Sequence, residues 1–186
     1  MNRENTFSIL IRLPEEESFY LKEITGRIAQ KRGLLTTKNE FHLTLEQTIS
    51  CSDKLFRVDL NDWLEQQPPI EFRLDQVDQF KNRQGGVIYL TTQDKKCKRR
   101  IVDLYQDIDE ITQTNDSFER RIFVPHVTLF QHVPFRMINQ LKNDFSSTIK
   151  PLTFEIDEIL VRKKIEGRGW VDYEKIPFGN ALSWVN

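Results

Sequence analysis

The chain has 186 residues, of which 38% are hydrophobic and 30% are charged, a composition typical of a soluble globular protein. Its formal net charge of −1 argues against a broad basic surface for long nucleic-acid duplexes, but leaves room for a small basic pocket. There is no apolar run long enough to span a membrane, no signal-peptide pattern, and no cysteine spacing typical of disulfides or zinc. We therefore expect a cytoplasmic monomer without membrane contact, metal or cofactor.

The first half of the chain is predicted to mix strands and helices. In order, hydrophobic spacing predicts a strand over 7–13, a helix over 15–31, a strand over 41–47, a helix over 52–67, and strands over 70–75 and 87–90. Gly33 is expected to end the first helix, because glycine takes the left-handed conformation that closes helices. Ser52 is expected to cap the second helix, and Gly85-Gly86 is expected to turn into the last strand.

The second half is predicted to follow a similar order. Hydrophobic spacing predicts a helix over 94–111, a strand over 124–131, a helix around 137–145, a strand over 152–164, and a final strand over 170–178. A turn over residues 167–169 makes the last two strands a hairpin. Basic residues crowd the start of the helix over 94–111, where positive charge is locally unfavourable. They serve either as a binding surface or as a solvated helix face.

Two stretches carry nearly the same short motif. Residues 42–45 read His-Leu-Thr-Leu and residues 126–129 read His-Val-Thr-Leu, and the chain has only three histidines. Period-two alternation puts the apolar residues on one face of each strand, with His42 and Thr44, or His126 and Thr128, on the other. Each strand therefore predicts an imidazole and a hydroxyl side by side, opposite a core face.

A second pair of segments recurs at nearly the same spacing. Residues 69–75 resemble residues 151–157 at an offset of 82, close to the 84 positions between the two histidines. Recurrence at a fixed offset indicates duplicated structural units. We therefore expect one domain over residues 1–186, built of two duplicated lobes.

These motifs resemble those of the 2H phosphoesterases, which include the LigT-like RNA ligases and cyclic nucleotide phosphodiesterases. That family carries one His-x-Thr/Ser-x motif per lobe, and the resemblance covers most of the chain. It implies a pseudo-symmetric α/β (α+β) fold: two lobes of antiparallel-rich sheet, outer helices and a central cleft. Many LigT-like members continue the first motif with a Phe-Leu-Gly turn, whereas this chain has Glu46-Gln47-Thr48. This difference leaves the substrate open.

Two histidines suit phosphodiester hydrolysis without a metal. Near neutral pH, one neutral imidazole can accept a proton from water while the other, protonated, donates to the departing ribose oxygen. The hydroxyls of Thr44 and Thr128 can donate to the non-bridging phosphate oxygens. The resemblance implies the same assignment, with His42 and His126 catalytic and the two threonines binding phosphate.

The sequence therefore favours a metal-independent phosphodiesterase acting on the 2′,3′-cyclic phosphate of a nucleotide or RNA end. Alternatives of the same class are hydrolysis of 2′-5′ oligoadenylates or cyclic oligonucleotides, and LigT-like 2′-5′ RNA ligation. The competing class is a non-catalytic nucleotide- or RNA-binding module of the same fold. Intact His and Thr in both motifs favour the enzyme. The serine-hydrolase elbow, the P-loop and the dinucleotide fingerprint are absent from the sequence.

Several further residues are weaker candidates. The expected cleft wall consists of Tyr89, Phe130, Arg168 and Trp170. Phe130 shares strand parity with His126 and serves either to stack on a base or to fill the interface between the lobes. Glu46 is expected on the face of His42, where it would orient that imidazole or contact a sugar or base. His132 is expected at the rim or surface.

Overall fold

The computed structural model describes residues 5–35, 40–51, 53–112 and 123–179, without the side chains of 46–48, 50–51 and 53–58. This part of the chain contains nine strands and four α-helices. The strands are β1 (Asn5–Arg12), β2 (His42–Cys51), β3 (Ile70–Leu74), β4 (Gln76–Asn82), β5 (Gly85–Thr91), β6 (Val127–Val133), β7 (Leu152–Ile156), β8 (Glu158–Ile165) and β9 (Gly169–Pro177). The helices are α1 (Glu15–Arg32), α2 (Asp53–Leu64), α3 (Lys95–Thr112) and α4 (Ile138–Thr148), with a short 3₁₀ helix, η1 (Phe135–Met137), before α4.

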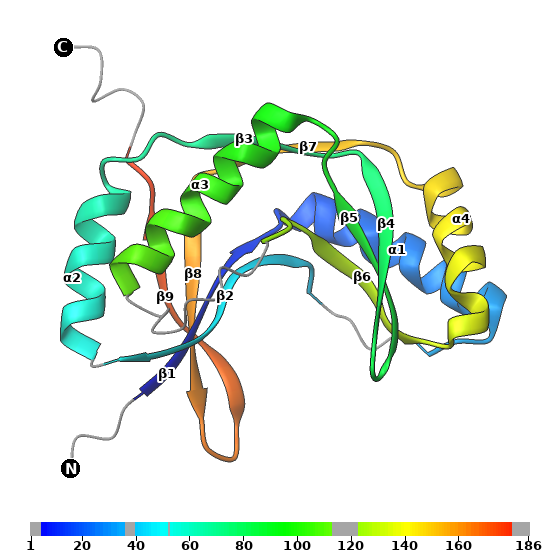
Figure 1. Ribbon diagram of the computed structural model, residues 1–186, viewed down its shortest axis with the longest axis horizontal. Coiled ribbons are helices and arrows are strands. Elements are labelled where there is room, and N and C mark those ends of the chain that lie inside the picture. The colour runs from blue at the N-terminus through cyan, green and yellow to red at the C-terminus, as the bar shows by residue number, and fades with distance from the viewer. Residues whose placement is uncertain (1–4, 36–39, 52, 113–122, 180–186) are drawn as a thin grey trace.

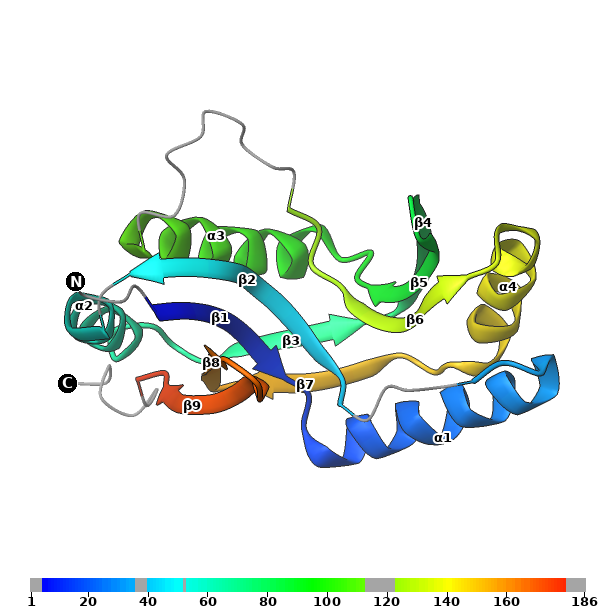
Figure 2. The ribbon, with the colours of Figure 1, turned by 90° about the horizontal axis from the view of Figure 1, so that it is seen from below.

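Seven strands form one sheet, and the other two form a separate pair. The sheet has the order β4-β5-β6-β2-β1-β8-β9, and every neighbouring pair is antiparallel. In Figure 1 the sheet curves into an arch with β3 and β7 across its top, while Figure 2 shows β2 and β6 from below, near the middle. Helix α2 packs against α3, and α1 against α4. The expected α/β class, with an antiparallel-rich sheet and outer helices, is confirmed.

The segments that recur at an offset of 82 pair with each other. Strand β3 alternates buried and exposed residues as predicted and pairs with β7 along its whole length. Phe72 faces Phe154 in this register, and their rings pack edge to face with 5.9 Å between the ring centroids. Both rings belong to the same core cluster as the apolar residues of β1, β2 and β6. The pair therefore closes the core on the convex side of the arch.

Both long helices have ends that their sequence explains. Gly33 closes α1 in the left-handed conformation, with φ 62°, and its N–H donates to carbonyls of the last turn. The Asp94 carboxylate accepts the backbone N–H groups of Lys96 and Cys97 at 2.8 and 3.1 Å. A carboxylate at this position satisfies orphan donors and favours the helix dipole, which offsets the basic residues that follow. The Ser52 cap predicted for α2 lies outside the described residues.

Two strand predictions were wrong. Strand β4 was not predicted, because its sequence is mostly polar; it forms by pairing residue for residue with β5, from Gln76–Thr91 to Asn82–Gly85. Gly85 and Gly86 consequently lie within β5, where a side chain at Gly86 would collide with Ile138 of α4. The strand predicted over 152–164 is two strands separated at Asp157, since β7 pairs with β3 whereas β8 pairs with β1 and β9.

No helix in the described ranges is long and apolar enough to cross a membrane.

Candidate active site

The two histidine motifs meet where β2 and β6 pair. Leu43 pairs with Val127 in antiparallel register, and both side chains are buried in the core. Directly opposite residues of antiparallel strands point to the same face of a sheet. The neighbours of this pair therefore project from the other face. Continuing the register by one residue in each direction sets His42 opposite Thr128 and Thr44 opposite His126.

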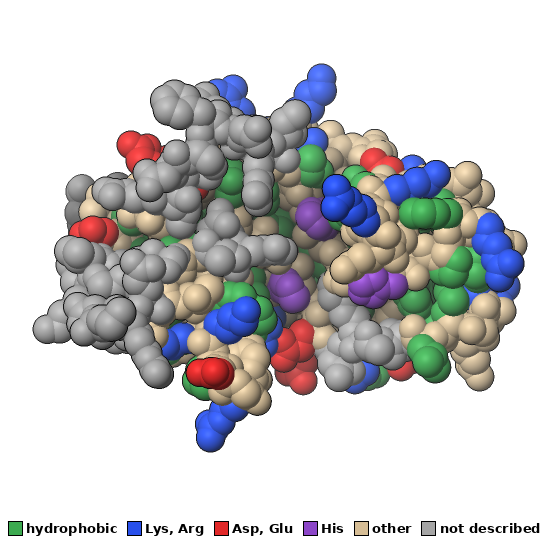
Figure 3. Space-filling view, turned by 60° about the horizontal axis from the view of Figure 1, so that its bottom comes forward, with side chains coloured by type: hydrophobic (Ala, Val, Ile, Leu, Met, Phe, Trp, Pro, Cys, Tyr) green, Lys and Arg blue, Asp and Glu red, His purple; other side chains and the backbone are tan. Residues whose placement is uncertain are grey.

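This register brings four functional groups together on the concave side of the sheet. Opposite residues have Cβ atoms roughly 4.5–5.5 Å apart, and diagonal neighbours such as the two histidines lie roughly 7–8 Å apart. All four side chains are half-buried. Figure 3 looks into the concave side of the arch, where histidine side chains lie along the hollow between its halves. A phosphate between the imidazoles would be within reach of both hydroxyls.

Each motif ends in a β-bulge at the same position. On β2, Leu10 pairs with Thr44 but Ile9 pairs with Glu46, so Leu45 is the extra residue. On β6, Tyr89 pairs with Thr128 but Ile88 pairs with Phe130, so Leu129 is the extra residue. Bulges bend a strand and re-aim the side chains beside them, and they occur often next to active sites. Here both bulges directly follow the threonine of the motif.

The His126 imidazole is held in one tautomer. Its Nδ1 lies 2.8 Å from the backbone oxygen of Val124. A carbonyl oxygen can only accept a hydrogen bond, so Nδ1 carries the proton and donates it. In the neutral ring, Nε2 is then the atom with a lone pair. The loop that holds this bond is itself anchored, because the Thr91 hydroxyl donates to the carbonyl of Pro125 at 2.7 Å.

Aromatic rings from β4 and β5 pack around the same imidazole. The Tyr89 ring packs edge to face against the His126 imidazole, with 5.1 Å between the ring centroids. The Phe80 ring packs against it in the same way, with 6.0 Å between the centroids. Tyr89 is also the cross-strand neighbour of Thr128 and of Asp78. These contacts limit the ring rotations open to His126 and keep it toward the concave face.

Tyr89 is anchored by a partly buried polar chain. Burial and the neighbouring Asp78 carboxylate, which accepts its hydroxyl, raise the pKa of Tyr89. Lys142 of α4 donates to Asp78 at 2.8 Å, and this bond, with smaller contributions from Gln79 and Tyr89, lowers the pKa of Asp78 despite burial. The chain Lys142–Asp78–Tyr89 therefore links helix α4 to the ring that packs on His126.

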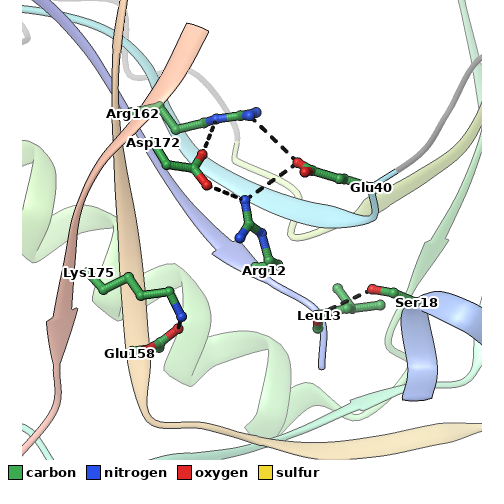
Figure 4. Close-up of polar contacts among 8 residues, drawn as sticks. All are labelled: Arg12, Leu13, Ser18, Glu40, Glu158, Arg162, Asp172 and Lys175. Carbon is green, nitrogen blue, oxygen red and sulfur yellow. Dashed lines mark hydrogen bonds and ion pairs between the residues drawn. The ribbon is translucent and has the colours of Figure 1, made fainter. Parts of the chain in front are cut away.

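On the other side of the site, Arg12 is the cross-strand neighbour of His42. Its Nη2 donates to Asp172 at 2.8 Å, and Arg162 donates to the other oxygen of the same carboxylate at 3.0 Å. The hydrogen bond to Asp172 raises the pKa of Arg12. Burial alone would raise the pKa of Asp172, but the two arginines outweigh it and lower that pKa. With Glu40 nearby, these residues form the four-charge cluster drawn in Figure 4.

Comparison with models of protein families identifies the family to which the chain belongs. The model of the 2′-5′ RNA ligase superfamily matches residues 14–168, which is most of the sequence and includes both His-x-Thr motifs. The chain belongs to the 2′-5′ RNA ligase superfamily. The expected kinship with the 2H phosphoesterases is thereby confirmed. No curated protein matches the sequence.

Solved structures share the fold of this superfamily member at low sequence identity. E. coli LigT in apo form is 18% identical with a TM-score of 0.65, covering 96% of this chain and 99% of LigT. A Thermus thermophilus protein is 17% identical with a TM-score of 0.61, over 95% and 99% of the two chains. Kluyveromyces marxianus Usb1 is 11% identical with a TM-score of 0.58, over 94% and 99%. LigT has also been solved with 3′-AMP and with ATP.

Of the weaker candidates in this superfamily member, Tyr89 lies beside the histidine motifs and Phe130 faces away from them. The bulge at Leu129 puts Phe130 in register with the buried Ile88, on the core side. Its ring lies 6.5 Å from that of Phe145 in α4. The alternation expected for β6 fails because a bulge shifts side-chain parity by one residue. The backbone of Glu46 pairs with Ile9 of β1, and the expected position of the Glu46 side chain lies outside the described part of the structure.

Arg168 and Trp170 lie at the far end of the β8–β9 hairpin. Trp170 pairs with Lys164, whose neighbour Lys163 pairs with Phe7 near the start of β1. Arg12, beside His42, is at the other end of that strand, five residues or roughly 16 Å away. The structure therefore does not bring these two residues to the histidines, although the hairpin itself was predicted. His132 is exposed, as expected, and has φ 56°.

The groups that surround the motifs were not predicted from the sequence. Arg12 carried a signal, because it is the one charged residue within the apolar run of residues 7–13; charged residues on buried strands are rare unless they are paired. Asp78 and Lys142 had no local signal, since they are 64 residues apart; Arg162 and Asp172 face each other across the predicted hairpin, but nothing local linked them to the distant Arg12. Among the described residues, no group of three or more His, Cys, Asp or Glu side chains could hold a metal ion.

Proposed function

We propose that the protein is a metal-independent phosphodiesterase that opens the 2′,3′-cyclic phosphate of a nucleotide or RNA end. The observation that carries this proposal is the Leu43–Val127 pair, which makes the two His-x-Thr motifs neighbours on one face of the sheet. A pair of imidazoles flanking one phosphate supplies both a base and an acid, and two hydroxyls supply donors for developing charge.

The reaction needs one neutral and one protonated histidine. The neutral imidazole takes a proton from water as the water oxygen bonds to phosphorus. The protonated imidazole gives its proton to the 2′ or 3′ ribose oxygen as the bond from phosphorus to that oxygen breaks, leaving a phosphomonoester. For His126 the exchanging atom is Nε2, because Nδ1 is committed to the Val124 carbonyl. Either histidine can act as the base, and the two roles exchange in the reverse direction.

The threonines act on the negative charge of the phosphate. Hydroxyls of Thr44 and Thr128 donate to the non-bridging oxygens, where charge gathers in the transition state. The bulges that follow both threonines bend the strands at this point, which supports a shared phosphate position. Tyr89 does not serve as the base, because its raised pKa keeps the hydroxyl protonated near neutral pH.

The comparisons support a nucleotide substrate. LigT, which shares this fold, binds 3′-AMP and ATP in crystals. A second candidate function is cleavage or formation of a 2′-5′ linkage, which the name of the matching family favours. The same two histidines would serve, with a 5′ oxygen as the leaving group or attacking group.

The test is turnover of a substrate panel with identification of the products. The panel comprises nucleoside 2′,3′-cyclic phosphates, an RNA ending in a cyclic phosphate, 2′-5′ and 3′-5′ dinucleotides, a 2′-5′ oligoadenylate and a cyclic oligonucleotide, each with and without excess EDTA. His42→Ala and His126→Ala should each lower turnover by roughly 10²–10⁴-fold. The double variant should be little worse than the poorer single variant, because the two groups act as a unit.

His132→Asn is the matched control, because it removes the third, exposed histidine while asparagine tolerates a positive φ. It should keep full activity. Binding of these ligands without turnover would indicate the non-catalytic module instead. Loss of activity in EDTA, restored by one divalent ion, would overturn the metal-independent mechanism.

A further inference from the structure

Two arginines converge on one carboxylate beside the candidate active site. Arg12 of β1 and Arg162 of β8 donate to separate oxygens of Asp172 on β9 at 2.8 and 3.0 Å. Their side chains are about one third and one fifth exposed, so both guanidiniums remain in contact with solvent. Each fork has further N–H donors beyond those that bind Asp172.

Glu40 occupies the space between the two guanidiniums only loosely. Its Oε2 lies 3.6 Å from Nη2 of Arg12 and 3.6 Å from Nη2 of Arg162. A separation of 3.6 Å is too long for a hydrogen bond, so the attraction is electrostatic, and half of the Glu40 side chain is exposed. Figure 4 shows this carboxylate facing both arginines from the segment just before β2. A negative oxygen is thus already held between the two Nη2 atoms, without the short contacts of a charged hydrogen bond.

The position of the pair suits a phosphate other than the one being cleaved. Arg12 is the neighbour of His42, but its Nη2 reaches to Asp172, which lies on the third strand from β2. Adjacent strands are roughly 4.8 Å apart, so Arg162 on β8 stands about 10 Å from the strand of His42. The guanidiniums therefore point along the concave face, away from the two imidazoles.

We propose that Arg12 and Arg162 bind a second phosphate of the substrate, which displaces the Glu40 carboxylate from between them. This inference rests on the proposed function and names its substrate class: the end of an oligonucleotide, with one further phosphodiester beside the reacting one. Paired arginine forks recognise phosphate oxygens through short, charge-assisted bonds. Asp172 stays bound and holds both forks in place, while Glu40 keeps the cluster neutral until substrate arrives.

The alternative is a structural brace that ties β1 to the β8–β9 hairpin. The two roles predict opposite effects for Glu40. If the cluster is a structural brace, removing the negative charge of Glu40 weakens the cluster or has no effect on it. In a phosphate site, removing it eliminates a competitor and strengthens binding of the second phosphate.

The experiment compares three substrates that share the reacting group. They are a nucleoside 2′,3′-cyclic phosphate, a dinucleotide ending in the same cyclic phosphate, and that dinucleotide with an uncharged methylphosphonate linkage. Arg12→Gln and Arg162→Gln should each lower kcat/KM for the charged dinucleotide by about 10- to 100-fold. The other two substrates should change by less than about threefold. Glu40→Gln should raise kcat/KM for the charged dinucleotide alone, by roughly threefold or more.

Lys175→Gln is the matched control. Lys175 pairs with Glu158 at 2.5 Å on the same hairpin, and Figure 4 draws this pair apart from the four-charge cluster. The substitution removes one positive charge and should leave the preference between charged and uncharged dinucleotide unchanged. If it lowers that preference as much as Arg162→Gln does, general electrostatics explains the effect and the site is refuted.

A binding measurement separates failure of this site from failure of the proposed reaction. Calorimetric titration of the two dinucleotides into the His42→Ala/His126→Ala protein gives dissociation constants without turnover. Tighter binding of the charged dinucleotide, weakened by Arg12→Gln and enhanced by Glu40→Gln, supports the site even if the reaction proves different. Equal binding of both dinucleotides, or equal losses for all three substrates in the arginine variants, leaves only the brace.

Discussion

Leu43 on β2 and Val127 on β6 pair across the centre of the sheet, and theirs is the one ladder pair between these strands in the described part of the chain. Both side chains have at most 1% exposure. The pair holds the two His-x-Thr motifs side by side while contributing no functional group itself. The candidate site therefore depends on a core contact directly beneath it.

Replacing this contact should affect stability and activity together. Leu43→Ala should cost about 2–5 kcal/mol in the free energy of unfolding, through lost burial and a cavity. It should also lower kcat/KM of the folded protein more than tenfold, because a displacement of about 1 Å at the histidines is costly. Leu21→Ala, in the equally buried core of α1, should cost similar stability but little activity. Urea denaturation and kinetics below the transition check both; equal activity losses would contradict the prediction.

The hydroxyl groups of Thr44 and Thr128 should contribute more to activity than the branched shape of the two side chains. Thr44→Val and Thr128→Val should each raise the barrier by about 2–4 kcal/mol, the usual loss for one donor to a developing charge. Valine keeps the branched shape and strand preference, so the unfolding transition should shift little. Thr44→Ser and Thr128→Ser restore the donor and should recover most of kcat. Valine variants with unchanged kcat/KM would remove the threonines from the mechanism.

The ring of Tyr89 should matter more than its hydroxyl. Tyr89→Phe keeps the edge-to-face contact with His126 and loses only the bond to Asp78, so kcat/KM should fall less than about fivefold. Tyr89→Leu removes the ring and frees the imidazole to rotate, and should cost roughly tenfold or more. The His126 side-chain NMR signals, measured in both variants, should broaden only in the leucine variant. Equal losses in both variants would instead assign the role to the hydroxyl.

The pH dependence of kcat/KM should be bell-shaped with a maximum between about pH 6 and 8, because one histidine must be neutral and the other protonated. The two limbs of this pH profile report the titration of the coupled pair His42 and His126, and neither limb belongs to one histidine alone. Replacing one histidine should abolish one limb and leave a low, one-sided profile, which identifies the base for that substrate. A flat profile from pH 5 to 9, with chemistry rate-limiting, would reduce the motifs to a phosphate-binding cradle.

Acid should weaken the contact between α1 and α4. Arg32 binds Asp144 through two bonds of 2.6 and 2.8 Å, and these bonds lower the pKa of Asp144. A carboxylate with a lowered folded-state pKa stabilises the fold above its unfolded pKa, about 3.9, and loses that contribution as pH falls through the folded value. The stability difference between wild type and Asp144→Asn should therefore be largest above pH 4 and shrink at lower pH. A difference that is constant from pH 7 to 2 would contradict this.

Local sequence was sufficient for the elements whose pattern is set by backbone geometry. The faces of residues 42–44 and 126–128 follow from the period of two in any strand, and the end of α1 at Gly33 follows from its left-handed conformation. Internal recurrence marked the two segments that form β3 and β7, but their pairing with each other was found only in the structure. The sequence by itself thus determined the family, the antiparallel α/β class and the four candidate residues of the two motifs.

Only the tertiary structure decided which residues surround those motifs. Whether β2 lies beside β6 depends on hydrogen bonds between strands more than 80 residues apart, which no local pattern encodes. The bulge at Leu129 moved Phe130 off the expected face, because one extra residue reverses side-chain parity. The polar strand β4 exists because β5 pairs with it, and it brings Phe80 and Asp78 to the site. The four-charge cluster likewise comes from four separate segments, and only folding brings its charged side chains together: Arg12, Glu40, Arg162 and Asp172.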